Sequence, residues 1–164
     1  MQVFGLIGWQ DSGKTTLMVK LIPEIINRGH TVSSMKHTHH NFDIDKPGKD
    51  SFEHRRAGAG EVLVASGKRW ALMHELDNQE EPTMDELVGM MAPVDLLLVE
   101  GFKRDQHAKM EVHRSKTNKP LLCENDPTVV AVASDKALPH LNIPVLDIND
   151  VAAIADFVLG HCEL

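Results

Sequence analysis

Eight residues near the N-terminus have the types and the spacing that are needed to bind the phosphate chain of a nucleotide. Residues 8–15 read Gly-Trp-Gln-Asp-Ser-Gly-Lys-Thr and match the P-loop pattern G-x-x-x-x-G-K-[ST] in full. The two glycines allow a close approach that a Cβ would block, so backbone N–H groups can face phosphate oxygens. In this pattern Lys14 binds the β- and γ-phosphates, Thr15 offers its hydroxyl to Mg²⁺, and Thr16 can reach the α-phosphate. The predicted nucleotide contacts of the loop are Gly8, Gln10, Asp11, Ser12, Gly13, Lys14, Thr15 and Thr16.

A carboxylate is expected near this loop, because a P-loop site also needs an acidic group close to its metal ion. In a parallel sheet, ligands collect at the carboxyl ends of the strands. The apolar run at residues 94–99 ends at Glu100, whereas Asp95 lies at the other end of the run, roughly 16 Å away on strand geometry. We therefore predict that Glu100 binds Mg²⁺, directly or through a water, and that Lys14 and Glu100 carry any catalysis.

Ser134 and Asp135 follow a later apolar run, at residues 128–133. An aspartate in this position can accept hydrogen bonds from N1 and N2 of guanine. Its two acceptor oxygens suit that pair of donors and do not suit adenine, whose N1 is itself an acceptor. Ser134 and Asp135 are therefore predicted to bind guanine, which makes GTP the expected nucleotide.

The polar segment that follows the predicted second strand is expected to form a substrate or switch loop beside the P-loop. Its three histidines leave three interpretations open, which are contact with an anion or substrate, a zinc or nickel site, and a solvated loop. The residues predicted to act in this loop are Lys36, His37, His39, His40, Asp45, Lys49, Asp50 and Arg56.

These residues must be positioned by the alternating strands and helices that the hydrophobic patterns predict. The alternation indicates an α/β fold with a mostly parallel sheet, in which hairpins make the sheet mixed. Residues 109–114 alternate in polarity and are predicted to form an exposed edge or hairpin strand. Pro23 is expected to kink or shorten the first helix. Strands are predicted at 2–7, 31–35, 61–66, 70–75, 94–99, 109–114, 128–133 and 143–146, and helices at 14–28, 50–59, 84–91 and 149–159.

Composition narrows the class of protein. A chain of 164 residues with 42% hydrophobic and 25% charged residues is expected to be one globular domain, residues 1–164. The longest apolar runs are about five residues, whereas a membrane-spanning helix needs ~20, and no secretory signal is recognisable. The net charge of −7 argues against nucleic-acid binding, and two cysteines suit a reducing cytoplasm. Residues 103–119 are locally basic, which indicates either an anion-binding patch or a solvated loop face.

Together these segments resemble one known family. Residues 8–15, 36–40, 45–51, 56–59, 99–103 and 133–135 are similar to the signatures of the molybdopterin-guanine dinucleotide biosynthesis adapter (MobB) family, and the resemblance covers nearly the whole chain. Very many proteins share the P-loop, but the signatures at residues 36–51 and 99–103 are specific. The resemblance implies a P-loop NTPase fold of the SIMIBI-like GTPase class, which includes the nickel-insertion GTPases.

The resemblance also implies ligands and partners. Family members bind GTP, hydrolyse it slowly and form homodimers, so this chain is expected to be at most a weak GTPase with an accessory role. They assist the guanylyltransferase that attaches GMP to molybdopterin, which makes that enzyme and a molybdopterin-related cofactor the expected partners. Two alternatives remain. One is a small-molecule or nucleotide kinase with residues 103–119 as its lid, and the other is a metallochaperone GTPase, suggested by the histidines.

Overall fold

The computed structural model of the chain describes residues 1–38 and 42–164, and these divide into two compact units. The first unit comprises Met1–His37 and Met91–Leu164, and the second comprises Thr38–Met90. Two residues of the predicted switch loop, His39 and His40, lie outside the described residues. The expectation of one domain over residues 1–164 stays a prediction.

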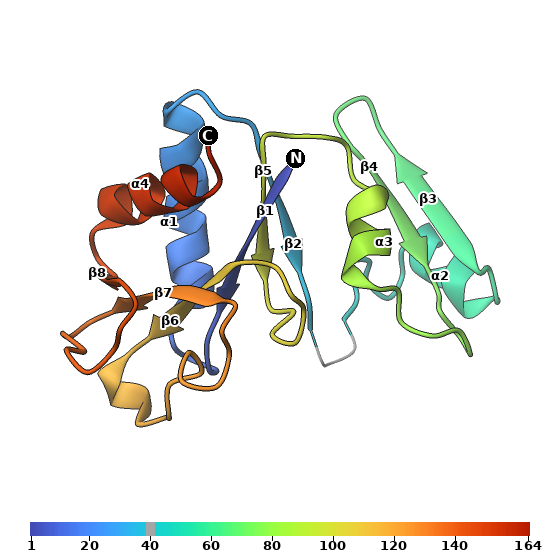
Figure 1. The fold of residues 1–164 in the computed structure, drawn as a ribbon. Coiled ribbons are helices and arrows are strands. Elements are labelled where there is room, and N and C mark those ends of the chain that lie inside the picture. Colours follow the sequence, from blue (N-terminus) through green and yellow to red (C-terminus); the bar gives the residue numbers. More distant parts are fainter. Residues whose placement is uncertain (39–41) are drawn as a thin grey trace. The chain divides into compact units, whose positions relative to one another are not determined.

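The first unit is built on parallel strands. Among the described residues they form a six-stranded sheet in the order β2-β5-β1-β6-β7-β8 (Figure 1). Every pairing in this sheet is parallel, which confirms the predicted α/β fold with a mostly parallel sheet. The sheet is not mixed as predicted, because β3 and β4 form a sheet of their own. The carboxyl ends of all the strands therefore meet at one edge, where ligands of such sheets bind. The strands are β1 (Gln2–Ile7), β2 (Val32–Lys36), β5 (Leu96–Glu100), β6 (Lys109–His113), β7 (Val129–Ser134) and β8 (Val145–Asp147).

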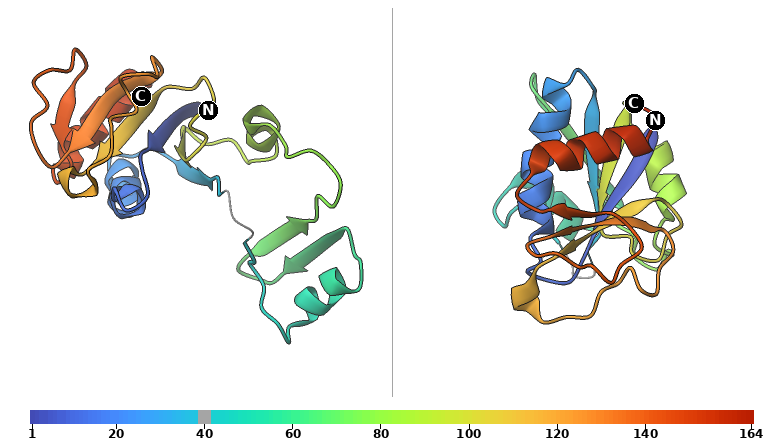
Figure 2. Two further views of the ribbon diagram at one scale, coloured as in Figure 1. Left: turned by 90° about the horizontal axis from the view of Figure 1, so that it is seen from below. Right: turned by 60° about the vertical axis from the view of Figure 1, so that its left-hand side comes forward.

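Helices α1 (Lys14–Asn27) and α4 (Val151–His161) pack on one face of this sheet, and α4 crosses α1 (Figure 2). Side chains alternate between the two faces of a strand, so every second residue of β1, Phe4 among them, faces the helices. Phe4 shares one core with Leu21 of α1 and Ile154 of α4, and all three are fully buried. Full burial of each such side chain contributes ~1.5–3 kcal/mol. This core holds β1 against α1 and thereby holds the loop that joins them.

Helix α1 does not end at its internal proline, contrary to the prediction that Pro23 could shorten it. The helix runs on to Asn27, and Gly29 beyond it has φ 95°, the left-handed conformation expected of a residue that terminates a helix. Pro23 has no N–H for the carbonyl of Val19, four residues earlier. Val19 is 66% exposed, so water can satisfy this carbonyl in place of the missing donor.

Strand β6 corrects the prediction of an exposed edge strand at residues 109–114. It lies between β1 and β7, and all five of its residues are buried. Its polar side chains are buried with partners. Lys109 Nζ donates to the carbonyl of Asp105 and to Thr128 Oγ1, and the Glu111 carboxylate accepts the backbone N–H of Leu122. Because both edges of β6 are paired within the chain, this strand offers no edge to a second molecule.

The second unit contains the predicted hairpin, formed by β3 (Glu61–Ala65) and β4 (Trp70–His74) as a separate antiparallel sheet. It also contains α2 (Asp50–Arg56) and α3 (Met84–Gly89). A capping box begins α3, because Thr83 accepts the backbone N–H of Glu86 while the Glu86 carboxylate accepts that of Thr83. No helix formed by the described residues is long and apolar enough to cross a bilayer.

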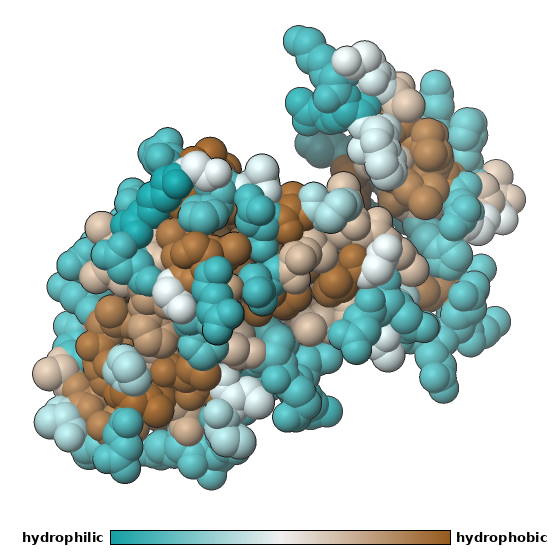
Figure 3. Space-filling model, turned by 45° about the horizontal axis from the view of Figure 1, so that its top comes forward, coloured by the Kyte–Doolittle hydropathy of each residue, from teal (hydrophilic) through white to brown (hydrophobic). Residues whose placement is uncertain are grey.

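One face of this hairpin exposes apolar side chains. Leu63 pairs with Leu72 and Ala65 with Trp70 across the two strands, so these side chains share a face. Leu63 is 61% exposed, Leu72 47% and Trp70 71%. On the face that Figure 3 displays, apolar residues gather in patches among hydrophilic ones.

Candidate nucleotide-binding site

The P-loop connects β1 to α1 and needs glycine at both of its glycine positions. Gly8 has φ 151°, and a Cβ there would lie 2.4 Å from the carbonyl oxygen of Val112 and 2.6 Å from Ser12 Oγ. Gly13 has φ 97° and directly precedes the first residue of α1. Only glycine adopts these torsion angles without strain. The loop therefore lies tightly against the end of β6, with its backbone unobstructed at the start of the helix.

Lys14 lies over this loop. Its Nζ donates hydrogen bonds to the carbonyl oxygens of Trp9, at 2.9 Å, and Gly8, at 3.1 Å. Burial lowers the pKa of Lys14 below its usual value, and the neighbouring charge of Lys103 lowers it further, while Glu100 acts in the opposite direction. The ammonium group is therefore held among backbone carbonyls, beside the positions where phosphate oxygens bind in a P-loop.

Thr15 and Glu100 are brought into contact by the pairing of β1 with β5. Leu6 is the register partner of Glu100, so Glu100 ends its strand level with the end of β1. Thr15 Oγ1 donates to the Glu100 carboxylate at 3.0 and 3.2 Å, and Lys36 Nζ lies 3.7 Å from Glu100 Oε1. A hydroxyl beside a carboxylate is a set of hard oxygen donors, and Mg²⁺ prefers such donors. The residues present thus fit the predicted magnesium ion.

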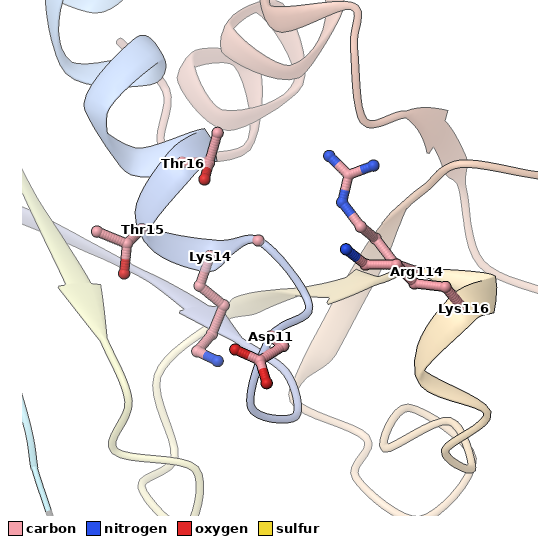
Figure 4. Close-up of a pocket in the computed structure, with 7 residues that line it drawn as sticks. Asp11, Lys14, Thr15, Thr16, Arg114 and Lys116 are labelled. Atoms are coloured by element: carbon pink, nitrogen blue, oxygen red, sulfur yellow. The ribbon is translucent and has the colours of Figure 1, made fainter.

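A cavity of about 500 Å³ opens in front of the P-loop (Figure 4). Arg114 and Lys116, which follow β6, face the residues of α1 across it. Sequence reasoning placed both cations in a basic surface patch and missed them as part of this site, because β6 was predicted to lie at an edge. The lining residues are Asp11, Gly13, Lys14, Thr15, Thr16, Arg114 and Lys116.

A second cavity, of about 300 Å³, is lined by Ser134, Asp135, Lys136 and Ala137 and by β8. Asp135 is held at its rim, because its Oδ1 accepts the backbone N–H of Ser115 at 2.9 Å and its Oδ2 accepts the Ser115 hydroxyl at 3.2 Å. The backbone N–H of Ser115 is the main reason that the pKa of Asp135 lies below its usual value. A carboxylate offers about four lone-pair sites, so this carboxylate can accept further hydrogen bonds.

Two lysines of the basic segment at residues 103–119 lie beside the P-loop tryptophan. Lys103 Nζ is 5.0 Å and Lys119 Nζ 5.8 Å from the centre of the Trp9 indole, and Trp9 Nε1 donates to the carbonyl oxygen of Pro120 at 2.8 Å. Ammonium groups at this distance from an indole face are attracted by its quadrupole. The segment thus adds positive charge to the surroundings of the P-loop.

The predicted switch-loop residues are divided between the two units. Lys36 and His37 belong to the first unit, where the backbone N–H of His37 donates to the carbonyl oxygen of Glu100 at 2.9 Å and its ring lies 4.7 Å from that of Phe102. Gly101 allows this approach, because a Cβ there would lie 3.0 Å from the His37 Cβ. These two residues therefore lie next to the predicted magnesium ligand.

The other described residues of this loop belong to the second unit. Asp45 is bound by Arg55 at 2.6 Å, and this arginine also binds Asp43 at 2.8 Å and Glu75 at 2.9 Å. These hydrogen bonds lower the pKa of Asp45. Lys49 is the N-cap residue of α2, Asp50 is its first residue, and Arg56 lies 3.9 Å from Glu53. No group of three or more histidine, cysteine, aspartate or glutamate side chains among the described residues is placed to hold a metal ion.

Comparison with known proteins finds relatives that match most of the chain. Residues 3–135 match the family model described as molybdopterin guanine dinucleotide synthesis protein B, MobB. The molybdopterin-guanine dinucleotide biosynthesis adapter protein of Escherichia coli K12 is 48% identical over 154 residues, which are 92% of this chain and 87% of that protein. The protein of the same description from Haemophilus influenzae is 43% identical over 95% of this chain and 86% of its own length.

Solved structures agree on the fold. A crystal structure of a MobB homologue from Bacillus stearothermophilus superimposes with a TM-score of 0.75 at 24% identity and covers 99% of both chains. The Bacillus subtilis MobB structure has a TM-score of 0.76 at 23% identity over 98% of this chain and 97% of that one.

Proposed function

The chain belongs to the MobB family of adapter proteins in molybdopterin-guanine dinucleotide biosynthesis, and we propose that it performs this role by binding GTP with Mg²⁺ at its P-loop. The observation that carries the proposal is the convergence of Lys14, Thr15 and Glu100 at the carboxyl edge of the parallel sheet. A chance match to the P-loop pattern would not bring a strand-end carboxylate within hydrogen-bond distance of the threonine.

The magnesium ion would be held by Thr15 and Glu100. Their oxygens already lie 3.0 Å apart, so little rearrangement is needed to turn both toward one cation. When bound, the ion neutralises negative charge on the phosphates. Lys36 lies at the same carboxylate and competes for its charge, so Lys36 must move away from Glu100 for the carboxylate to bind the ion fully.

Guanine recognition is assigned to Ser134 and Asp135. The cavity of about 300 Å³ beside them has a carboxylate at its rim and the strand end of β8 as its other wall. The Asp135 oxygens that accept from Ser115 have lone pairs left for N1 and N2 of the base. Preference for GTP over ATP is therefore expected to depend on Asp135.

Slow hydrolysis is part of the proposal, and the ion pairs of Arg55 support it. Fast P-loop GTPases position a water and supply a cation to the transition state. Arg55 is engaged by three carboxylates of its own unit, Asp43, Asp45 and Glu75. We expect turnover well below the ~1–100 s⁻¹ that is typical of kinases. Release of phosphate at several per second by the isolated protein would contradict this expectation.

The proposed partners are the guanylyltransferase, a molybdopterin-related cofactor and a second copy of the chain, in the cytoplasm. The homodimer is supported by the hairpin, because in the described residues β3 and β4 pair only with each other and one face exposes Leu63, Trp70 and Leu72. An unpaired strand edge is a template for pairing with another chain. Sedimentation at micromolar concentration is expected to give twice the chain mass of 18.2 kDa, and a monomer would refute the dimer.

The deciding experiment is a titration with GTP and with ATP, each with and without Mg²⁺. GTP is expected to bind more tightly than ATP, and Mg²⁺ is expected to strengthen GTP binding. When the titration is repeated with Lys14→Ala, the control for a general change of charge is Lys20→Ala, an exposed position of the same helix α1. Equal affinity for the two nucleotides would overturn the guanine assignment, and no binding of either would overturn the proposed function.

A further inference from the structure

Five polar residues stand in a fixed order along the carboxyl edge of the sheet. Glu100 ends β5, Lys14 follows β1, Arg114 follows β6, Asp135 follows β7, and Asp147 ends β8. Because β5, β1, β6, β7 and β8 are consecutive neighbours in the sheet, this is also their order in space. Neighbouring strands lie ~4.8 Å apart, so the edge from β5 to β7 spans roughly 14 Å, a length that an extended nucleoside triphosphate covers.

The order of the side chains matches the order of the groups on a nucleotide. In the proposed site Glu100 and Thr15 lie where the metal ion and the terminal phosphate bind, and Lys14 lies where the β- and γ-phosphates bind. The cavity after β7 is the proposed place of the base. What lies between the P-loop and the base is the α-phosphate and the ribose. In the structure that intermediate position is occupied by the side chain that follows β6, which is Arg114.

Arg114 has the placement and the charge that this position requires. Its guanidinium lies against Gly13, since a Cβ on that glycine would be 3.1 Å from Arg114 Nε and 3.7 Å from Nη2. It lines the same cavity as Thr16, the residue that can reach the α-phosphate in the P-loop pattern (Figure 4). Among the described residues no carboxylate forms a direct ion pair with Arg114, although its charge contributes to the lowered pKa of Asp135, so its planar fork of N–H donors can bind an anion.

Ser115 ties this arginine to the base cavity. The residue directly after Arg114 donates both its backbone N–H and its hydroxyl to Asp135. It begins the short 3₁₀ turn Ser115–Thr117, which also carries Lys116 into the phosphate cavity. The carboxylate that is proposed to bind guanine therefore also anchors the backbone on which Arg114 and Lys116 stand.

We propose that Arg114 binds the α-phosphate of the guanine nucleotide and that Asp135, through its two hydrogen bonds to Ser115, positions Arg114 for this contact. The inference rests on the proposed function, because it states which residues of the GTP site bind the guanosine and α-phosphate that GMP, GDP and GTP share. The base and the α-phosphate are then recognised as one unit, independently of Lys14 and the magnesium ligands. The guanosine 5′-monophosphate moiety is then the part of the nucleotide that Asp135 and Arg114 bind together.

The first test compares the affinities of guanosine, GMP, GDP and GTP for wild type and Arg114→Ala. The variant is expected to lose roughly tenfold to a hundredfold in affinity for GMP, GDP and GTP alike, and to keep the affinity for guanosine. Lys14→Ala is expected to show a different pattern, a loss for GDP and GTP with little change for GMP. Arg104→Ala, an exposed arginine of the same basic segment that does not line the cavity, is the matched control.

Several outcomes would overturn the inference and leave the GTP site in place. A loss confined to GTP would assign Arg114 to the terminal phosphate. An equal loss for guanosine would mean that Arg114 acts on the fold of the site, and unchanged binding of GMP would mean that it does not bind the α-phosphate. Failure of wild type to bind any of the guanine nucleotides would instead refute the proposed function itself.

The second test concerns the positioning role of Asp135. In an Asp135→Ala background, which lacks both hydrogen bonds to Ser115, Arg114→Ala is expected to cost much less GMP affinity than in wild type. Asp135→Asn retains an amide oxygen for the Ser115 N–H, so the full effect of Arg114→Ala is expected to return when binding is measured with xanthosine 5′-monophosphate, whose base is complementary to asparagine. Independent, additive effects in the Asp135→Ala background would show that Asp135 does not act through Arg114.

Discussion

Replacing Lys14 with alanine is expected to weaken GTP binding by roughly tenfold to a hundredfold without unfolding the protein. A hydrogen bond from a charged group contributes about 1.5–3 kcal/mol, and each 1.4 kcal/mol is a factor of about ten in affinity. Lys14 Nζ lies at the P-loop, within 2.9 Å of the Trp9 carbonyl oxygen, so it needs only to exchange carbonyl oxygens for phosphate oxygens when the nucleotide binds.

The expected effect of the same substitution on stability is small. The two hydrogen bonds from the Lys14 ammonium to the carbonyl oxygens of Gly8 and Trp9 stabilise the loop, by about 1.5–3 kcal/mol each before the cost of burying the charge. Partial burial of the ammonium opposes this stabilisation, because burial disfavours the charged form in the folded state and thereby lowers the pKa of Lys14. We expect the free energy of unfolding of Lys14→Ala to stay within about 1 kcal/mol of wild type, as measured by urea denaturation.

The assay can use the P-loop tryptophan as its reporter. The sequence has only two tryptophans, Trp9 in the loop and Trp70 in the hairpin. Trp70→Phe leaves Trp9, whose fluorescence is expected to change when a nucleotide displaces the Lys103 and Lys119 ammonium groups around it. Lys20→Ala in this background is the control. Equal GTP affinities of Lys14→Ala and the control would refute the assignment of Lys14.

The pKa of Lys14 also predicts how GTP affinity depends on pH. Only the protonated amine attracts the phosphates, and binding an anion raises its pKa, so affinity is constant below the pKa of the unliganded protein and falls as the pH rises through it. Because burial lowers this pKa from 10.5, the loss is expected to begin at a lower pH than for an exposed lysine. Lys14→Arg is expected to move the loss to higher pH, and an identical profile for both proteins would contradict the argument.

Three further substitutions follow from the site. Glu100→Gln is expected to remove most of the gain in GTP affinity that Mg²⁺ provides while leaving the affinity in EDTA nearly unchanged, as calorimetry would show; a retained gain would exclude Glu100 as a ligand. Asp135→Asn is expected to lose about 1–3 kcal/mol of GTP binding and to gain affinity for XTP in a competition titration, since the xanthine 2-oxo group accepts from the amide. Gly8→Ala places a Cβ 2.4 Å from the carbonyl oxygen of Val112, so it is expected to lower the free energy of unfolding by about 1–3 kcal/mol and to impair GTP binding. Gly60→Ala, whose Cβ would lie in open space, is the control, and denaturation is expected to find its stability near that of wild type.

Several parts of the protein could be predicted because their determinants are local in the sequence. The P-loop is contiguous, so its glycines and Lys14 are recognisable without knowledge of the fold. The capping box of Thr83 and Glu86 depends on residues three positions apart. The position of Glu100 needed one further step, because any parallel sheet brings the carboxyl end of an apolar strand to the ligand edge. Boundaries of most strands and helices accordingly agree with the structure to within a few residues.

The burial of strand β6 could not be predicted from local sequence. Its alternation of Lys109, Met110, Glu111 and Val112 is the same whether the polar side chains face water or are buried with partners. Lys109 binds Thr128 as well as its near neighbour Asp105, and Glu111 accepts the N–H groups of the segment at residues 122–123; Thr128 and this segment are more than ten residues away in the chain. Such non-local satisfaction of buried polar groups cannot be recognised from a hydrophobic period.

The tertiary structure therefore decided which residues share the site. The amino-acid sequence alone was sufficient to recognise the phosphate loop, most elements of the sheet and the family signatures, since each depends on neighbours along the chain. It did not determine strand order, which places β6 between β1 and β7 and so brings Arg114 to Gly13 and Ser115 to Asp135. Strand order is set by the packing of distant apolar faces against α1 and α4, and this packing free energy belongs to the folded chain as a whole rather than to any segment of it.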